Sequence, residues 1–197
     1  MIRVGITGGI GSGKTTVCRI WEQMGAYVIH ADELAKDIMV RDPELIKSIK
    51  KVFGDQAYLS DGSLNRSWLA EQAFANNRVS ELNALVHPAV YKASDLLMRK
   101  AETLGYALAV REAAILLQNG RPNDLNKIVL VLADKENRRY WVESRDDLTK
   151  EQIDHRMRSQ PDYETYISLA DIVIQNDGTL KDLENKARQT YIDLTTI

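Results

Sequence analysis

Apolar residues along this chain follow two different periods, which separate strand-forming from helix-forming segments. Five short runs are rich in β-branched and other apolar residues, as strands buried inside a parallel sheet are. Between them, apolar residues recur every three or four positions, which predicts amphipathic helices. Strands that alternate with helices predict an α/β fold with a parallel sheet. The five predicted strands are residues 2–7, 26–29, 106–110, 127–132 and 170–174.

The segment from residue 42 to residue 104 departs from this alternation, because only helical stripes occur in it. Asp61-Gly62-Ser63 is typical of a turn, and a further helix is predicted to start at Leu64-Asn65-Arg66. Pro88 is expected to kink or restart its helix, because proline lacks an amide N–H. We interpret the segment as a helical insertion beside the sheet. One stripe is Leu45, Ile46, Ile49, Val52 and Phe53, and another is Leu82, Leu85, Val86, Val90, Ala93 and Leu97.

A glycine-rich sequence, Gly8-Gly9-Ile10-Gly11-Ser12-Gly13-Lys14-Thr15, connects the first predicted strand to the first predicted helix. It fits G-x-x-x-x-G-K-[ST], the phosphate-binding loop of nucleotide-dependent enzymes. Glycines let backbone amides approach a triphosphate closely, and the helix N-terminus adds its dipole. Lys14 is expected to contact the β- and γ-phosphates, and Thr15 to be a Mg²⁺ ligand. The loop predicts ATP contacts at Gly11, Ser12, Gly13, Lys14, Thr15 and Thr16.

Two aspartates follow predicted strands and compete for one chemical role. Asp32 comes after the strand at 26–29, and Asp134 after the strand at 127–132. Ligands of open α/β sheets bind beyond the carboxyl ends of the strands, so either carboxylate can orient Mg²⁺ or accept a proton. Either can instead cap the helix that follows, which for Asp32 is predicted to begin near Glu33. We rank Asp32 first as the catalytic base.

Charge becomes dense between Arg138 and Glu164, where arginines alternate with acidic residues. A solvated helical hairpin accounts for this pattern. The alternative is a lid whose arginines close on the phosphates and exclude water from the transferring group. The arginines of this segment are Arg138, Arg139, Arg145, Arg156 and Arg158.

The composition of the chain limits its partners and its compartment. Its formal net charge of −2 gives no reason to expect a nucleic-acid partner. The single cysteine, Cys18, cannot form an internal disulfide, so we expect a small buried residue in a reducing compartment. No apolar stretch reaches the roughly 18 residues that span a bilayer, and Met1 runs directly into a predicted strand. We expect a soluble cytoplasmic protein without a membrane partner, as a monomer or weak homo-oligomer.

Further motifs, spread over nearly the whole chain, resemble one family. They are residues 7–15, His30-Ala31-Asp32, residues 61–66, 82–88 and 145–149, Gln160, and residues 170–174 and 176–178. On these residues the chain resembles the dephospho-coenzyme A kinases, and the Leu-Asn and His-Pro pairs at 82–88 make the resemblance specific. The resemblance implies a three-layer P-loop NTPase fold with a five-stranded parallel sheet, a helical substrate-binding insertion and a lid. It implies ATP-dependent phosphorylation of the ribose 3′-hydroxyl of dephospho-coenzyme A, the last step of coenzyme A biosynthesis.

The resemblance also implies roles for individual residues. Lys14, Asp32 and Arg145 are expected to be catalytic, with Asp32 as the base and Arg156 as a second arginine of the lid. The expected substrate contacts are Thr7, Asp32, Arg66 and His87. Further ATP contacts are expected at Arg145, Asn176, Asp177 and Gly178.

Three positions depart from the family pattern. His30 replaces the first aspartate of Asp-Ala-Asp. The segment 112–118 reads E-A-A-I-L-L-Q where the family has D-x-P-L-L-x-E, so Gln118 replaces a carboxylate. Trp141 stands where the lid is expected to have an arginine, and Arg138, one helical turn earlier, is a candidate substitute.

Two rival functions share parts of the pattern. A kinase for another small acceptor, such as a nucleoside monophosphate, shares the core and lid, but the helical insertion disfavours it. A regulatory GTPase needs a guanine-reading N-K-x-D, whereas residues 126–129 read N-K-I-V. Within one domain, 1–197, we expect a core at about 1–40, 105–137 and 168–197, the insertion at about 41–104 and the lid at about 138–167.

Overall fold

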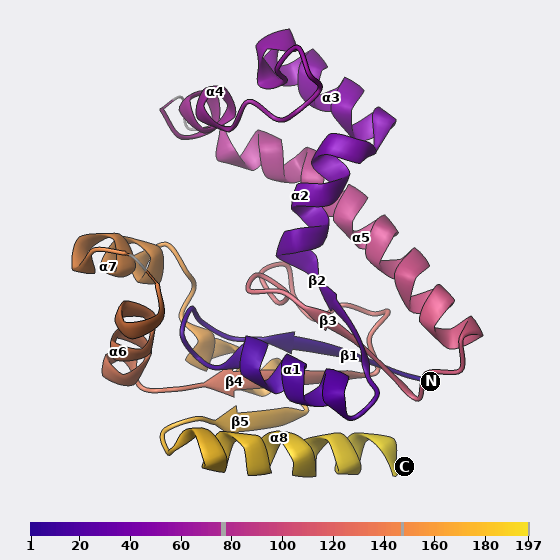
Figure 1. Ribbon diagram of the computed structural model, residues 1–197, viewed down its shortest axis with the longest axis vertical. Coiled ribbons are helices and arrows are strands. Elements are labelled where there is room, and N and C mark those ends of the chain that lie inside the picture. Colours follow the sequence, from indigo (N-terminus) through magenta and orange to yellow (C-terminus); the bar gives the residue numbers. More distant parts are fainter. Residues whose placement is uncertain (76–77, 147, 197) are drawn as a thin grey trace. The chain divides into compact units, whose positions relative to one another are not determined.

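The computed structural model describes residues 1–75, 78–146 and 148–196 (Figure 1). Five strands form one sheet in the order β2-β3-β1-β4-β5. The central strand β1 pairs in parallel with β3 and β4, and β4 pairs in parallel with β5. The predicted five-stranded sheet of an α/β fold is confirmed. The strands are β1 (Ile2–Thr7), β2 (Tyr27–His30), β3 (Leu108–Glu112), β4 (Lys127–Leu132) and β5 (Ile172–Gln175).

The chain folds as two compact units. One unit comprises Met1–Ile29 and Met98–Ile197 and contains most of the sheet, and the other comprises His30–Leu97. The helix α5 (Val79–Thr103) continues from the second unit into the first. The division into a core, an insertion and a lid with separate roles stays a prediction. The other helices of the first unit are α1 (Lys14–Gln23), α6 (Lys135–Arg145), α7 (Lys150–Arg158), the 3₁₀ segment η3 (Tyr163–Leu169) and α8 (Leu180–Thr195).

Helices α1 and α8 pack together against one face of the sheet (Figure 1). Trp21 of α1 and Ala187 of α8 share a buried core with Val129 of β4, and the Trp21 Nε1 donates to the Ala187 carbonyl at 2.8 Å. Because neighbouring strand residues point to opposite faces, Ile128 points away from this core, and it is also fully buried. Both faces of the sheet are therefore covered, as a three-layer fold requires.

The helical unit has a hydrophobic core of its own, which the predicted stripes supply. Ile49 and Phe53 pack in it with Ile38, Leu69 and Val86, so four helices contribute to it. Asn65 caps α4 by accepting from the Trp68 amide at 3.2 Å, and the predicted helix start there is confirmed. No helix among the described residues is long and apolar enough to cross a membrane. Besides part of α5, the unit contains α2 (Ala31–Arg41), α3 (Pro43–Phe53), the 3₁₀ segment η1 (Asp55–Ala57), α4 (Arg66–Ala70) and the π-helical segment η2 (Glu71–Ala75).

The predicted boundaries of strands β2, β3 and β5 are wrong by one or two residues. Strand β3 ends at Glu112, two residues later than the predicted 106–110, because residues up to Glu112 pair with β1. The strand tolerates Arg111 in its interior because Arg111 Nη2 lies 2.6 Å from the Asp124 carboxylate. Of the two alternatives at Pro88, the restart is wrong, since α5 continues through this residue without ending, and the kink stays a prediction.

Candidate active site

The glycine-rich loop leaves the central strand β1 and leads into α1, so it lies at the carboxyl end of the sheet. Gly8 has a φ of +149°, and an added Cβ there meets the Val131 carbonyl oxygen at 2.2 Å. Gly13 has a φ of +100°, and its added Cβ meets the Asn176 amide nitrogen at 2.7 Å. Glycine is required at both positions, because residues of β4 and of the segment after β5 approach the loop backbone so closely.

Lys14, the first residue of α1, is held by the loop itself. It is 8% exposed, and its Nζ donates to the Gly9 carbonyl at 3.1 Å. The Ser12 amide donates to the same carbonyl at 3.1 Å, while the Ser12 Oγ is buried without a hydrogen-bond partner among the described residues. The next residue, Thr15, is exposed. The structure thus gathers the predicted ATP contacts, Gly11, Ser12, Gly13, Lys14, Thr15 and Thr16, in one loop and the first turn of α1.

Asn176 connects the segment after β5 to this loop, and Asp177 connects the same segment to the one after β4. Asn176 is 6% exposed, and its Nδ2 donates to the Ser12 carbonyl at 3.0 Å. Asp177 Oδ1 accepts from the Asp134 amide at 2.9 Å, and Gly178 follows it on the surface. The Asn176 bond gives this residue a role in holding the loop, whereas the Asp177 bond joins the segments that follow β5 and β4. The expected position of both residues beside adenine, together with Gly178, stays a prediction.

Thr7, an expected substrate contact, is fully buried at the end of β1. Its Oγ1 donates to the Ala114 carbonyl at 3.1 Å, and the Tyr163 hydroxyl donates to the same carbonyl at 2.8 Å. The threonine therefore orients the turn that follows β3, and its contact with a substrate stays a prediction.

Glu112 was not among the predicted site residues, because the predicted strand ended at residue 110. It ends β3 and lies opposite Ile6 of β1, two residues before the loop begins. Burial and then the Glu112 charge raise the pKa of Cys18 in α1 well above its ordinary value. Glu112 is therefore close to both elements that flank the loop. The signal that could have identified it is the motif at 112–118, in which Glu112 stands where the family has an aspartate. Cys18 is buried, as predicted, and its raised pKa keeps the thiol neutral.

The two competing aspartates occupy different positions at the starts of their helices. Asp134 occupies the N-cap position of α6, but its side chain makes no capping hydrogen bond. Asp32 is the second residue of α2, which begins at Ala31 rather than near Glu33, and it is exposed. His30, not Asp32, therefore holds the N-cap position of α2. Capping by the Asp32 side chain was a wrong alternative, and its role as the base stays a prediction.

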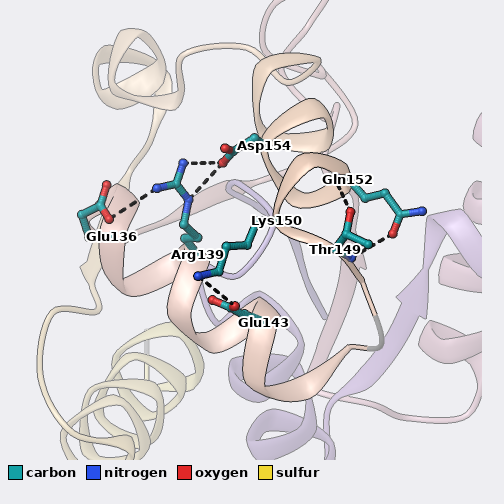
Figure 2. A network of polar contacts seen from close by, with 7 residues as sticks. All are labelled: Glu136, Arg139, Glu143, Thr149, Lys150, Gln152 and Asp154. Atoms are coloured by element: carbon teal, nitrogen blue, oxygen red, sulfur yellow. Dashed lines mark hydrogen bonds and ion pairs between the residues drawn. The ribbon is translucent and has the colours of Figure 1, made fainter.

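The charged segment forms a helical hairpin of α6 and α7 (Figure 2). The Arg139 guanidinium bonds to Asp154 of α7 and lies 3.6 Å from Glu136. Lys150 and Glu143 form a second link between the helices, at 3.5 Å. Thr149 and Gln152 form a capping box that starts α7. Asp147, part of the motif at 145–149, lies outside the described residues.

The arginines of the hairpin differ in their surroundings. Arg145, the expected phosphate contact, is 61% exposed and makes two bonds to Asp146, at 2.8 and 3.0 Å. This pairing lowers the pKa of Asp146 below its ordinary value. Arg156 is exposed, whereas Arg138 lies against the loop at Gly9. The Gln160 Oε1 accepts from the Ile10 amide at 2.8 Å, which adds a second contact between this segment and the loop.

The candidates of the helical unit lie at its surface. Arg66 is exposed as the first residue of α4 and makes no hydrogen bond or ion pair with any residue that the structure describes. His87 is half-buried in α5. At the departing positions, His30 holds the N-cap position of α2, Gln118 is exposed, and Trp141 is half-buried in α6.

Comparison with known proteins assigns this loop, sheet and hairpin to a family. A family model described as dephospho-CoA kinase matches residues 2–182. The chain belongs to the dephospho-CoA kinase family. A dephospho-CoA kinase of Salinibacter ruber is 41% identical over 196 residues, which cover 99% of this chain and 98% of that one. The corresponding protein of Corynebacterium glutamicum is 34% identical, with 98% of both chains covered.

Solved structures support the dephospho-CoA kinase fold over the whole chain. The Thermus thermophilus protein TT1252 matches with a TM-score of 0.78 and 33% identity, covering 98% of both chains. Dephospho-CoA kinase from Campylobacter jejuni matches with a TM-score of 0.66 at 22% identity, covering 99% of this chain and 98% of that one, which compares the fold alone. The predicted family, fold and enzyme class, a kinase, are therefore confirmed.

Proposed function

We propose that this chain transfers the γ-phosphoryl group of ATP to the ribose 3′-hydroxyl of dephospho-coenzyme A, giving coenzyme A and ADP. The observation that carries the proposal is a complete phosphate-binding loop in a chain that the family model matches from residue 2 to residue 182. Phosphoryl transfer passes through a loose transition state, so catalysis consists mainly of positioning and charge stabilisation. The loop supplies both.

The phosphates meet a site that is already ordered. Loop amides from Gly11 to Thr15 and the Lys14 ammonium are the donors for the β- and γ-phosphates. The Asn176 bond to the Ser12 carbonyl and the close contact of Gly8 with β4 fix the loop before nucleotide binds. Little free energy is then spent on ordering these donors during the reaction.

Asp32 is our candidate for the base that accepts the proton of the 3′-hydroxyl. Its carboxylate is exposed in the first turn of α2, immediately after β2. A carboxylate in this place is accessible to an acceptor hydroxyl, and general-base catalysis contributes roughly 10²- to 10⁴-fold to a rate. Arg66 and His87 of the helical unit are the candidates for binding the acceptor.

Mg²⁺ fits the donors that the chain offers. Within the described ranges, no three His, Cys, Asp or Glu side chains form a group that could hold a metal. A kinase needs no such group, because Mg²⁺ keeps several waters and takes one or two protein oxygens together with substrate phosphates. The exposed Thr15 hydroxyl is such an oxygen, and the Glu112 carboxylate is a second candidate. Bound with ATP, the ion neutralises phosphate charge.

The proposal also covers the roles of the core, the insertion and the hairpin, and the compartment and oligomeric state of the protein. We assign nucleotide binding to the core, acceptor binding to the helical insertion and water exclusion to the α6–α7 hairpin. We also propose a cytoplasmic enzyme, a monomer or weak homo-oligomer, without a nucleic-acid partner. The neutral, buried thiol of the single cysteine, Cys18, fits a reducing compartment.

Acceptor specificity tests the function directly. ADP release is measured with Mg-ATP and either dephospho-coenzyme A, AMP, GMP or no acceptor. We expect release only with dephospho-coenzyme A, and a product heavier by one phosphoryl group on the ribose. Equal release with AMP or GMP would favour a nucleoside monophosphate kinase. Release that needs no acceptor would indicate a nucleotide hydrolase.

A further inference from the structure

Arg138, in the first turn of α6, lies directly on the phosphate-binding loop. An added Cβ at Gly9 meets the Arg138 Nη1 at 1.9 Å, so the guanidinium occupies the space that a side chain at residue 9 would need. The Arg138 backbone covers the loop as well, because an added Cβ at Gly11 meets the Arg138 carbonyl oxygen at 2.7 Å. The start of α6 and the loop are therefore in contact through both backbone and side chain.

The guanidinium is desolvated there without an acceptor for one of its donors. Arg138 Nε is buried and has no hydrogen-bond partner among the described residues. Burial lowers the pKa of Arg138, and only the weaker attraction of Tyr163 and Asp162 opposes this effect. Arginine nevertheless remains protonated in proteins. Arg138 is half-buried, and its buried Nε has no acceptor among the described residues, so an anion that joins the guanidinium there is favourable.

Neighbouring arginines lack this combination. Arg139 is paired with Asp154 of α7, and Arg145 is paired with Asp146 at the exposed end of α6. Arg138 alone among these three combines contact with the loop and a buried donor without a partner in the described structure. We propose that Arg138 binds the β- or γ-phosphate of ATP and is the arginine through which the α6–α7 hairpin senses the nucleotide.

The contact also explains the sequence at Gly9. The motif G-x-x-x-x-G-K-[ST] allows any residue at this position. Here a larger residue would displace the Arg138 guanidinium from the loop, so glycine at residue 9 leaves room for this contact. A planar fork of N–H donors suits a phosphate, and a charge-assisted bond of this kind changes affinity by about tenfold to hundredfold.

Nucleotide titrations of three variants test the assignment. Arg138→Met removes the charge but keeps much of the side-chain length, and Arg138→Lys keeps the charge without the fork. Arg139→Met is the matched control, because it removes the adjacent arginine, which faces Asp154. Each variant is titrated with ATP, ADP and adenosine, and its melting temperature is measured without ligand. We expect Arg138→Met to weaken ATP binding by about tenfold to hundredfold, and adenosine binding by less than about twofold.

The other two variants complete the test. Arg138→Lys should fall between wild type and Arg138→Met, and Arg139→Met should bind ATP like wild type. Unchanged ATP affinity in Arg138→Met would overturn the proposal. Equal losses for ATP and adenosine would also overturn it, because they indicate a packing role. The inference rests on the proposed function in one respect only, which is that ATP is the phosphate donor. If the wild type failed to phosphorylate dephospho-coenzyme A, the titrations would still decide the role of Arg138.

Discussion

Two candidate side chains at the phosphate-binding loop are buried and bonded to backbone, whereas two candidates in the helical unit are exposed in the first turns of their helices. Lys14 and Asn176 are 8% and 6% exposed, and both donate to loop carbonyls. Asp32 and Arg66 are exposed in the first turns of α2 and α4. The two pairs of side chains therefore differ in solvent exposure.

This difference matches what each half of a phosphoryl transfer needs. Charge develops on the phosphates in the transition state, and preorganised donors stabilise it without further ordering. An acceptor must instead enter and leave at each turnover, which exposed side chains permit. We therefore expect substitutions at the loop to lower the chemical rate most, and those in the helical unit to act mainly on acceptor binding, with Asp32 as the exception.

Lys14→Ala should have the largest effect. Removing the ammonium should lower kcat by about 10²- to 10³-fold or more, because one preorganised electrostatic contact to the transition state is lost. The melting temperature should stay within a few degrees, since Lys14 bonds to loop backbone rather than packing in the core. Steady-state assays and thermal unfolding check both, with the exposed Lys47→Ala as the control. Wild-type turnover in folded Lys14→Ala would refute the role of the loop.

Asp32→Asn tests the exposed region for a catalytic group. The amide keeps the shape of the side chain but is not a base, so single-turnover rates should fall by about 10²-fold while ATP affinity stays unchanged. Asp134→Asn is the matched control. Because its side chain makes no capping bond, it should change neither the rate nor the melting temperature appreciably. If Asp134→Asn lost the chemical step and Asp32→Asn kept it, the base would be Asp134.

Arg66→Ala should separate acceptor binding from nucleotide binding. We expect affinity for dephospho-coenzyme A to fall by about tenfold or more, as for the loss of a bond to a charged group, with ATP affinity unchanged. Arg41→Ala is a suitable control, since Arg41 lies on the same helical unit and its Nε lies 2.8 Å from Asp37. Calorimetric titration with each ligand measures both affinities. Equal acceptor affinity in Arg66→Ala and wild type would remove Arg66 from the site.

The sequence predicted the loop and its flanks well because their signals are local. Glycine positions, Lys14 and the apolar strand before them depend on neighbouring residues only, and the structure has the loop where the motif predicts it. Strand β4, at Lys127–Leu132, also agrees with its prediction. Its continuous apolar run leaves little choice of boundary.

Features that depend on distant partners were missed. The boundary of β3 was misplaced because Arg111 reads as a polar strand end, whereas its ion pair with Asp124 lets it lie inside the strand. The start of α2 was also misplaced, because the apolar spacing predicts a helix from about Glu33 with Asp32 as its cap, whereas α2 begins at Ala31. The contact of Arg138 with Gly9 depends on which side of α6 meets the loop, and no local pattern determines that.

Asp171→Asn should have the smallest effect on chemistry. It tests whether the stability of the first unit can be lowered, at a position away from the loop, without a change in turnover. Asp171 Oδ2 accepts from the Ile128 amide at 2.7 Å and lies 2.7 Å from Arg121 Nη2, at the start of β5 rather than at its carboxyl end. Asparagine can still accept from Ile128 but loses the ion pair, so we expect unfolding free energy to fall by about 1 kcal/mol near neutral pH. Turnover below the melting temperature should not change.

Acidification provides the second measurement for Asp171. Burial alone would raise the pKa of this carboxyl, but the hydrogen bond from the Ile128 amide and the charge of Arg121 outweigh it and lower the pKa below its ordinary value. The ionised form therefore stabilises the fold above about pH 4, and this contribution is lost as the pH falls through the lowered folded-state pKa. Wild type and Asp171→Asn should converge in stability on acidification, whereas Asp37→Asn, in an exposed pair on α2, should match wild type throughout. A constant difference at every pH would mean that the ion pair is not the cause. A loss of turnover at full stability would mean that the order of the loop depends on the opposite end of the sheet.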